Sequence, residues 1–90
     1  MALLIDKPVW PWRGRLWSHL VSDVSYDELH AFVTAELGIP RRAFQGDHYD
    51  IPEDLYDAAV AAGATPVGAR ELLGRLVGAG LRLKKPRPGA

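Results

Sequence analysis

Cysteine is absent from this chain of 90 residues, and so are several patterns that would indicate a function directly. Without cysteine the protein can form no disulfide, no thiolate nucleophile and no zinc site built on sulfur. The sequence also contains no His-Glu-x-x-His, no Gly-x-Ser-x-Gly and no glycine-rich phosphate loop. Any chemistry must therefore rest on histidine, acidic and basic side chains.

Long apolar runs are missing as well. No stretch approaches the roughly 20 residues that cross a bilayer. The first residues carry neither the basic region nor the apolar region of a secretory signal. We therefore expect a cytoplasmic protein that does not contact a membrane.

Neither sign of charge is in excess, because 11 Lys and Arg balance 11 Asp and Glu, whereas a dedicated DNA-binding protein would be basic overall. The balance hides an uneven distribution. Residues 1–69 carry 5 basic and 10 acidic side chains, and residues 70–90 carry 6 basic and 1 acidic. A chain of this length forms one core and encloses no deep cavity. We expect one domain over residues 1–80, a flexible basic tail over residues 81–90, and any site in a surface cleft.

Hydrophobic spacing and capping signals predict strands that alternate with helices. Ser25 and Glu28 form a capping box that begins a helix, and Gly38 ends it. Residues 9–21 fit either a pair of strands or a helix from Arg15. The other predicted elements are a strand over residues 2–6, a strand over residues 43–45, a helix from Asp50 to about Ala62, a short strand over residues 65–67, and a helix that closes at residues 78–80.

This alternation favours a parallel sheet, because parallel neighbours need a covering connection of about a dozen residues. We predict an α/β fold, a small sandwich with about three mainly parallel strands and three helices. Ligands of such sheets bind beyond the carboxyl ends of the strands. That edge should carry Asp6, residues 48–50 and residues 67–70.

Acidic and imidazole side chains are predicted to gather at this edge. If residues 48–50 are extended, His48 and Asp50 project to one side and Tyr49 to the other. Because imidazoles and carboxylates together bind divalent metals, we predict Asp6, His48 and Asp50 as ligands of an ion such as Zn, Mn or Mg. The alternative for Asp50 is a structural N-cap of the helix that follows.

Catalytic roles are predicted for His19, His48 and Asp23. His19 and Asp23 lie four residues apart, which places both on one face if the segment is helical. Such pairs exchange protons near neutral pH. Arg15 is predicted to neutralise the charge that develops on phosphate oxygens. The predicted ligand contacts are Arg13, Arg15, Tyr49 and His30.

Two of these features have structural alternatives. His30 sits at the margin of an apolar stripe. The alternative to a ligand contact is that His30 is a histidine at the edge of the core, with its ring hydrogen-bonded to a backbone carbonyl. Trp10, Trp12 and Trp17 are interleaved with arginines, a combination that stacks bases and holds phosphates. The alternative is that the indoles cap one end of a small core and the arginines extend over them.

The polar residues are grouped into short motifs, namely Gly14-Arg15, His19 with Asp23, Glu28-Leu29-His30 and His48-Tyr49-Asp50. Together with Asp6 and the Gly63-Ala64 step, they resemble a family of short bacterial and phage proteins known only as a domain of unknown function. The resemblance covers residues 2 to about 77. It brings no activity, cofactor or substrate, and it implies that these residues occur together and converge in space.

Two classes of function fit the sequence. The first is a metal-dependent, phosphoesterase-like hydrolase that acts on a small phosphate-bearing ligand in the His/Asp/Arg pocket. The second is a non-catalytic binding module, in which the histidines and acids form a structural network. In such a module, a protein or nucleic-acid partner is contacted by the basic tail or by the surface that the three tryptophans and the interleaved arginines form. The free edges of a three-stranded sheet would also permit a homodimer.

Overall fold

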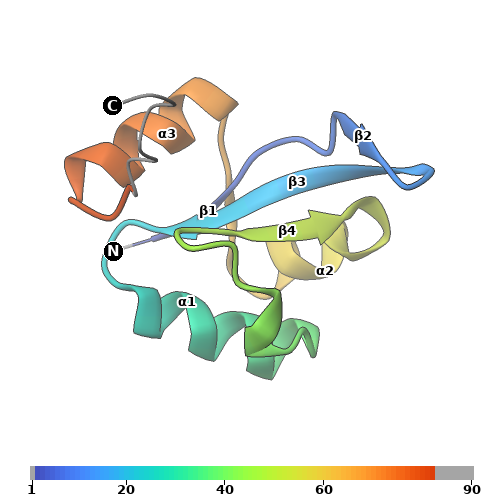
Figure 1. The fold of residues 1–90 in the computed structure, drawn as a ribbon, viewed down its shortest axis with the longest axis horizontal. Coiled ribbons are helices and arrows are strands. Elements are labelled where there is room, and N and C mark those ends of the chain that lie inside the picture. Colours follow the sequence, from blue (N-terminus) through green and yellow to red (C-terminus); the bar gives the residue numbers. More distant parts are fainter. Residues whose placement is uncertain (1, 83–90) are drawn as a thin grey trace, which may run out of the picture.

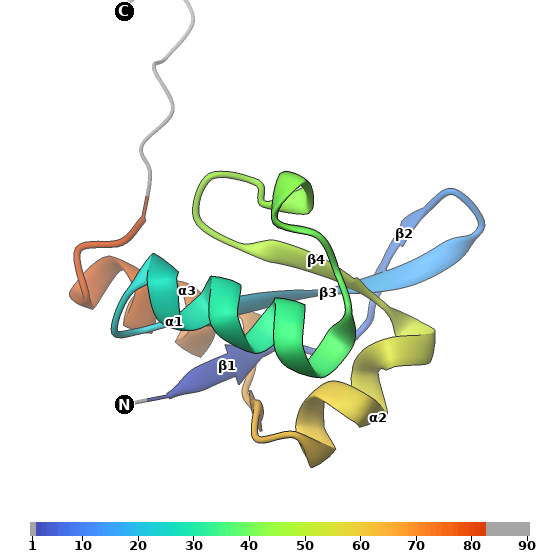
Figure 2. The same cartoon turned by 90° about the horizontal axis from the view of Figure 1, so that it is seen from below.

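The computed structural model describes residues 2–82, which form a five-stranded mixed sheet with helices on both faces (Figures 1 and 2). The elements in chain order are β1 (Leu3–Ile5), β2 (Trp10–Trp12), β3 (Arg15–Ser22), α1 (Tyr26–Phe32), the π-helical turn η1 (Val33–Leu37), the 3₁₀ turn η2 (Arg41–Ala43), β4 (Tyr49–Pro52), α2 (Glu53–Ala61), β5 (Thr65–Pro66) and α3 (Ala69–Gly78).

The long strand β3 organises the sheet. It pairs in antiparallel fashion with β1, β2 and β4. The remaining strand, β5, pairs in parallel with β1. Leu20 is the register partner of both Ile5 and Tyr49, so β1 and β4 lie on opposite edges of β3. The prediction of about three mainly parallel strands was therefore wrong, although the α/β class is confirmed.

A tight turn explains the antiparallel start of the sheet. Arg13 and Gly14 both have positive φ angles, 49° and 74°. This pair of conformations is typical of the two-residue hairpin turns that match the twist of antiparallel strands. The turn joins β2 to β3, so residues 9–21 form the strand pair and not the helix that Arg15 could have begun.

The second predicted strand lies in a different place. Residues 41–43 form a 3₁₀ turn, and the strand follows at Tyr49–Pro52. Tyr49 and Ile51 are fully buried and alternate with polar neighbours, which is the period of a half-buried strand. Asp50 is therefore inside β4 and does not cap α2, which begins after Pro52.

The helix predicted from Ser25 is confirmed. The Ser25 hydroxyl accepts a hydrogen bond from the Glu28 amide at 3.1 Å. The Glu28 carboxylate accepts instead from the Ser22 hydroxyl at 3.2 Å, so the reciprocal half of the capping box is replaced. The chain continues through η1 to Gly38, whose φ of 66° ends it in the left-handed conformation.

The two faces of the sheet are covered differently. Helices α1 and α2 pack on one face, where the larger core cluster consists of Ile5, Leu20, Leu29, Val33, Tyr49, Ile51, Ala59 and Ala64. Helix α3 packs on the other face, over the smaller cluster of Leu4, Val21, Leu72 and Leu76. Figure 1 shows that α3 covers only the end of this face near β1 and leaves the end that carries β2 uncovered.

Leu81 packs against the smaller cluster, and its carbonyl accepts a hydrogen bond from the Tyr26 hydroxyl. Residues 83–90, most of the predicted basic tail, lie outside the described residues. Within the described part of the chain, every helix is too short or too polar to cross a membrane.

Candidate metal centre

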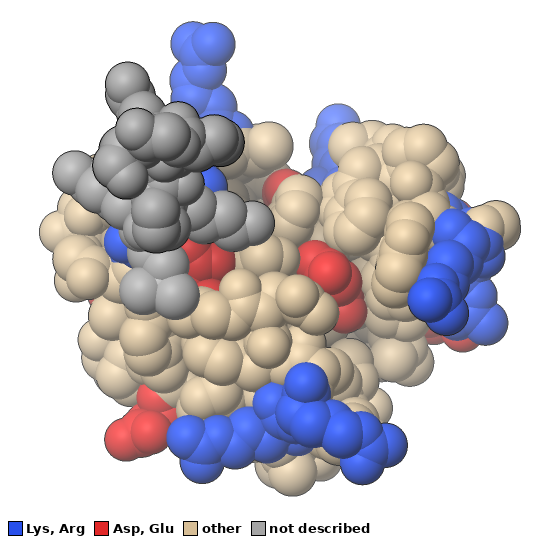
Figure 3. All heavy atoms as spheres, viewed as in Figure 1, with Lys and Arg blue, Asp and Glu red and all other residues tan. Residues whose placement is uncertain are grey.

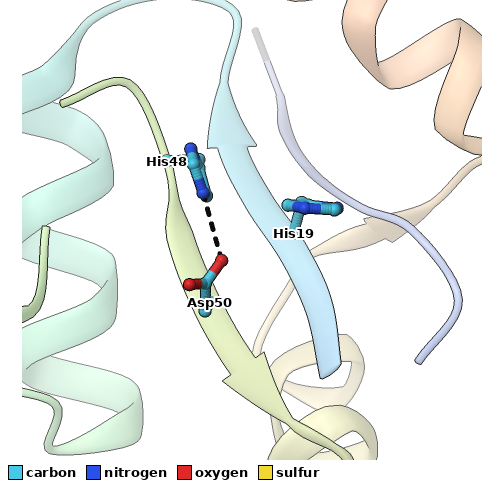
Figure 4. Close-up of side chains that lie close together, drawn as sticks. All are labelled: His19, His48 and Asp50. Carbon is cyan, nitrogen blue, oxygen red and sulfur yellow. Dashed lines mark ion pairs between the residues drawn. The ribbon is translucent and has the colours of Figure 1, made fainter. Parts of the chain in front are cut away.

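Two histidines and an aspartate meet on the open part of the sheet. His19 of β3 and Asp50 of β4 are register partners, so their side chains share a face. His48 lies two residues before Asp50 and, because side chains alternate along the chain, projects to the same side. One ligand atom from each of the three lies within 4.8 Å of the others. Figure 4 shows His48 and Asp50 on the β4 segment and His19 on the neighbouring strand β3.

Each imidazole is held by a separate, buried carboxylate. The Nδ1 atom of His19 lies 2.8 Å from an oxygen of Asp6, and the other Asp6 oxygen accepts from the His19 amide at 2.6 Å. The Nδ1 atom of His48 lies 2.7 Å from Asp47. A carboxylate at Nδ1 fixes the tautomer and leaves Nε2 to bind a metal, an arrangement that is common around metal-ligating histidines.

Asp50 supplies an oxygen that lacks a hydrogen bond among residues 2–82. This atom, Oδ1, is buried and lies 3.1 Å from Nε2 of His48, but the contact does not have the alignment of a hydrogen bond. A buried acceptor without a donor costs roughly 1–3 kcal/mol. A cation placed between Asp50 and His48 would remove that cost.

The electrostatics of the site also favour a cation. Burial disfavours protonation of His48, but the nearby negative charges of Asp50 and Asp47 and the contact of Asp47 with Nδ1 outweigh it and raise the pKa of His48 above its ordinary value. Three carboxylates surround the two imidazoles, and one of them, Asp47, pairs with Arg82, whose Nη1 lies 3.5 Å away. The site therefore has an excess of negative charge when the histidines are neutral.

A pocket of about 250 Å³ opens beside the centre, between the sheet and α3. Its polar wall contains Asp6, His19, Asp47 and His48, together with Arg82, and its apolar wall contains Leu72, Leu73 and Leu76 of α3. Figure 3 shows a hollow between the half of the molecule that carries α3 and the half that carries β2, with acidic side chains inside it.

The structure brings together His19, His48 and Asp50 from the predicted set and places Asp6 directly behind His19. It does not bring Arg15 or Asp23 to them. Arg15 lies four residues before His19 on an extended strand, about 13 Å away, and pairs with Asp54 at 3.4 Å. The helical alternative for this segment was wrong, because Arg15–Ser22 form β3, and so no helical turn brings Asp23 to His19.

Asp23 lies beyond the other end of β3. Its carboxylate accepts from the Ala2 amide at 2.9 Å and pairs with Arg75 of α3 at 2.6 Å. The hydrogen bond from Arg75 lowers the pKa of Asp23 in spite of partial burial. Asp23 therefore ties α3 to the sheet.

His30 and Tyr49 occupy the opposite, covered face. The Nδ1 atom of His30 lies 2.7 Å from the Tyr49 hydroxyl, and both residues are buried. Burial lowers the pKa of His30 and raises that of Tyr49. The structural interpretation of His30 fits this position, although its partner is a phenol and not a backbone carbonyl.

Sequence reasoning missed Asp47 and Trp10 as neighbours of the centre. Asp47 directly precedes His48 in the chain, which indicates that the two residues are close. This adjacency alone does not predict that the Asp47 carboxylate contacts Nδ1 of His48. The Trp10 ring is stacked on the His19 ring, with the two ring centroids 5.6 Å apart. This contact depends on the pairing of β2 with β3 and has no local signal.

Fold and site together define a small α/β protein with a cluster of histidines and aspartates on a half-covered sheet. The family model described as a protein of unknown function (DUF4031) matches residues 3–79, and the chain belongs to this family. No curated protein and no solved structure matches the chain.

Proposed function

We propose that His19, His48 and Asp50 bind a divalent transition-metal ion and that the loaded protein hydrolyses a phosphate-bearing ligand. The observation that carries the proposal is the pair of carboxylate contacts at the two Nδ1 atoms, from Asp6 to His19 and from Asp47 to His48. Each contact leaves Nε2 of its ring as the nitrogen for the ion.

The donor set suits this chemistry. Two imidazoles and one carboxylate are typical of zinc hydrolases and of non-haem iron sites, which keep coordination positions open for water and substrate. Ligand distances of about 2.0–2.2 Å imply separations of roughly 3.5 Å between ligand atoms around a tetrahedral ion. The present separations reach 4.8 Å, and small rotations of these partly exposed side chains would shorten them to that value.

In hydrolysis, the oxygen of the metal-activated water bonds to phosphorus while the bond from phosphorus to the leaving oxygen breaks, and a proton from the water ends on the leaving group. Arg82 lines the pocket and is placed to contact phosphate oxygens, the role that the sequence suggested for Arg15.

The first test is isothermal titration calorimetry of the whole chain with Zn²⁺ and with Mn²⁺. We expect Asp50→Asn and His48→Asn to weaken the binding of the preferred ion by more than about 100-fold, because even outer-shell changes cost 10–100-fold. The matched control is Asp57→Asn, which makes the same change on the exposed surface of α2. Absence of binding to the wild type, or equal affinity of Asp50→Asn and the control, would show that the network is structural.

The second test measures hydrolysis of bis(p-nitrophenyl) phosphate by the loaded wild type, the two site variants and the control. We expect release of nitrophenol by the wild type and the control only, and loss of that activity after chelation by EDTA. Tight metal binding without hydrolysis of this ester or of a monoester would reject the catalytic half of the proposal.

A further inference from the structure

A row of aromatic rings leads from the edge of the molecule to the candidate metal centre. The ring centroids are 6.4 Å apart between Trp12 and Trp10, 5.6 Å between Trp10 and His19, and 5.3 Å between His19 and His48. Trp17 flanks the row, with its ring 6.1 Å from that of Trp10 and 5.5 Å from that of Trp12. The row therefore ends at two of the three proposed ligands.

These tryptophans do not form part of the core. Neither of the two core clusters of the described residues includes an indole. Trp12 is 47% exposed, on the part of the sheet that α3 leaves open. Tryptophan is enriched at binding interfaces, because it combines a large apolar ring with a polar N–H group. The position argues against the alternative in which the indoles cap the core.

The cluster is held in place before any ligand arrives. Trp10 and Trp17 are register partners across β2 and β3. The indole nitrogen of Trp17 donates to the carbonyl of Trp12 at 2.8 Å, which fixes one side chain against the neighbouring backbone. The indole nitrogen of Trp10 is buried without a partner among the described residues. A rigid platform loses little conformational entropy when it binds a flat group.

Positive charge accompanies the exposed end of the row. The guanidinium carbon of Arg13 lies 4.6 Å from the centroid of the Trp12 ring. Arg15 stands two residues away, with a half-exposed side chain. Figure 3 shows basic side chains at the end of the molecule that the β2–β3 hairpin forms. The hairpin thus offers flat rings for stacking and cations for phosphates, the combination that binds single-stranded nucleic acid.

We propose that single-stranded nucleic acid is the substrate of this site. Its bases stack on Trp12 and Trp10, and its backbone passes Arg13 so that a phosphodiester enters the pocket at His19 and His48. The inference rests on the proposed metal-dependent hydrolysis for its catalytic part, but not for the stacking. Duplex does not fit as well, because its bases stack on each other and do not expose their faces.

The test measures the fluorescence anisotropy of a fluorescein-labelled oligothymidylate during titration with the whole chain, in EDTA so that no cleavage occurs. We expect Trp12→Leu to weaken binding by about tenfold or more, the usual cost of removing one stacked base. We expect Arg13→Gln to weaken it less and to reduce the dependence on salt by about one phosphate contact. Trp12→Phe should retain most of the affinity, because the ring is kept.

Val77→Ser is the matched control, since Val77 is an exposed apolar residue on α3, away from the hairpin. Circular dichroism checks that each variant is folded. Equal affinity of Trp12→Leu, Arg13→Gln and the control would overturn the inference. Tighter binding of duplex or of a proline-rich peptide at the same platform would also overturn it.

The two proposals fail in distinguishable ways. If the wild type binds no metal but the oligonucleotide affinity depends on Trp12, the proposed hydrolysis fails and the platform stands. If the loaded protein cleaves bis(p-nitrophenyl) phosphate but oligonucleotide affinity is insensitive to Trp12 and Arg13, the metal centre stands and the substrate class is wrong.

Discussion

The two faces of the sheet hold the same kind of side chain in different environments. On the covered face, His30 is buried against the Tyr49 hydroxyl and burial lowers its pKa. On the open face, His48 lies between Asp47 and Asp50, and these acids raise its pKa in spite of burial. The comparison shows that a histidine in this fold is buried where helices cover it and remains partly exposed where the cover ends.

The largest effect should come from the covered face. Leu20 is fully buried in the larger core cluster, so Leu20→Ala should lower the free energy of unfolding by about 2–5 kcal/mol. Leu16→Ala removes the same atoms from an exposed position of the same strand and should cost less than about 1 kcal/mol. Urea denaturation measures both, and similar losses would contradict the difference in burial between these two positions of the covered face.

The second prediction tests whether the acids on the open face orient the two histidines for metal binding. Asp47→Asn keeps the shape of the side chain but weakens its hold on the Nδ1 atom of His48, and Asp6→Asn does the same at His19. We expect each substitution to reduce metal affinity by about 10–100-fold, although the three proposed ligands are unchanged. Calorimetry with the ion preferred by the wild type checks this. An unchanged affinity would mean that the carboxylates do not orient the ligands.

The third prediction concerns pH and the covered histidine. Because the folded pKa of His30 lies below its ordinary value of 6.5, its contribution to stability is complete above that value and is lost as the pH falls towards the folded pKa. The free energy of unfolding of the wild type should therefore fall from about pH 7 to about pH 5 more steeply than that of His30→Gln. His48 shifts in the opposite direction, but it is present in both proteins and cancels in the difference. A parallel pH dependence of the two proteins would show that His30 titrates normally.

The smallest effect is expected at the ion pair that ties α3 to the sheet. Arg75→Gln removes the partner of Asp23 and should cost less than about 1 kcal/mol, because Arg75 is largely exposed. The lowered pKa of Asp23 gives stability that is present above its ordinary value of 3.8 and is lost as the pH falls. Denaturation at neutral and at acid pH should show that the difference between wild type and variant disappears in acid.

Local signals were enough for some of this structure. The helix from Ser25 to Gly38 was predictable because its cap and its stop are each specified by residues that are close together in the chain. The alternation at residues 48–50 correctly predicted that Tyr49 turns away from His48 and Asp50, which follows from any extended backbone.

Long-range pairing was not predictable in the same way. His19 joins Asp50 only because β3 and β4 pair across 31 residues of chain, a contact that neither segment specifies by itself. The segment around His19 fits a helical period as well as an extended one, and this ambiguity put Asp23 beside His19 in the prediction. Arg15 was assigned to the pocket for its positive charge, whereas the extended chain carries it to the far end of β3.

The placement of the indoles provides a built-in optical probe. All three tryptophans of the chain belong to the one cluster beside His19, so the tryptophan fluorescence of the protein reports on that cluster alone. A paramagnetic ion at the histidines should quench this emission at close range, without any label or substitution.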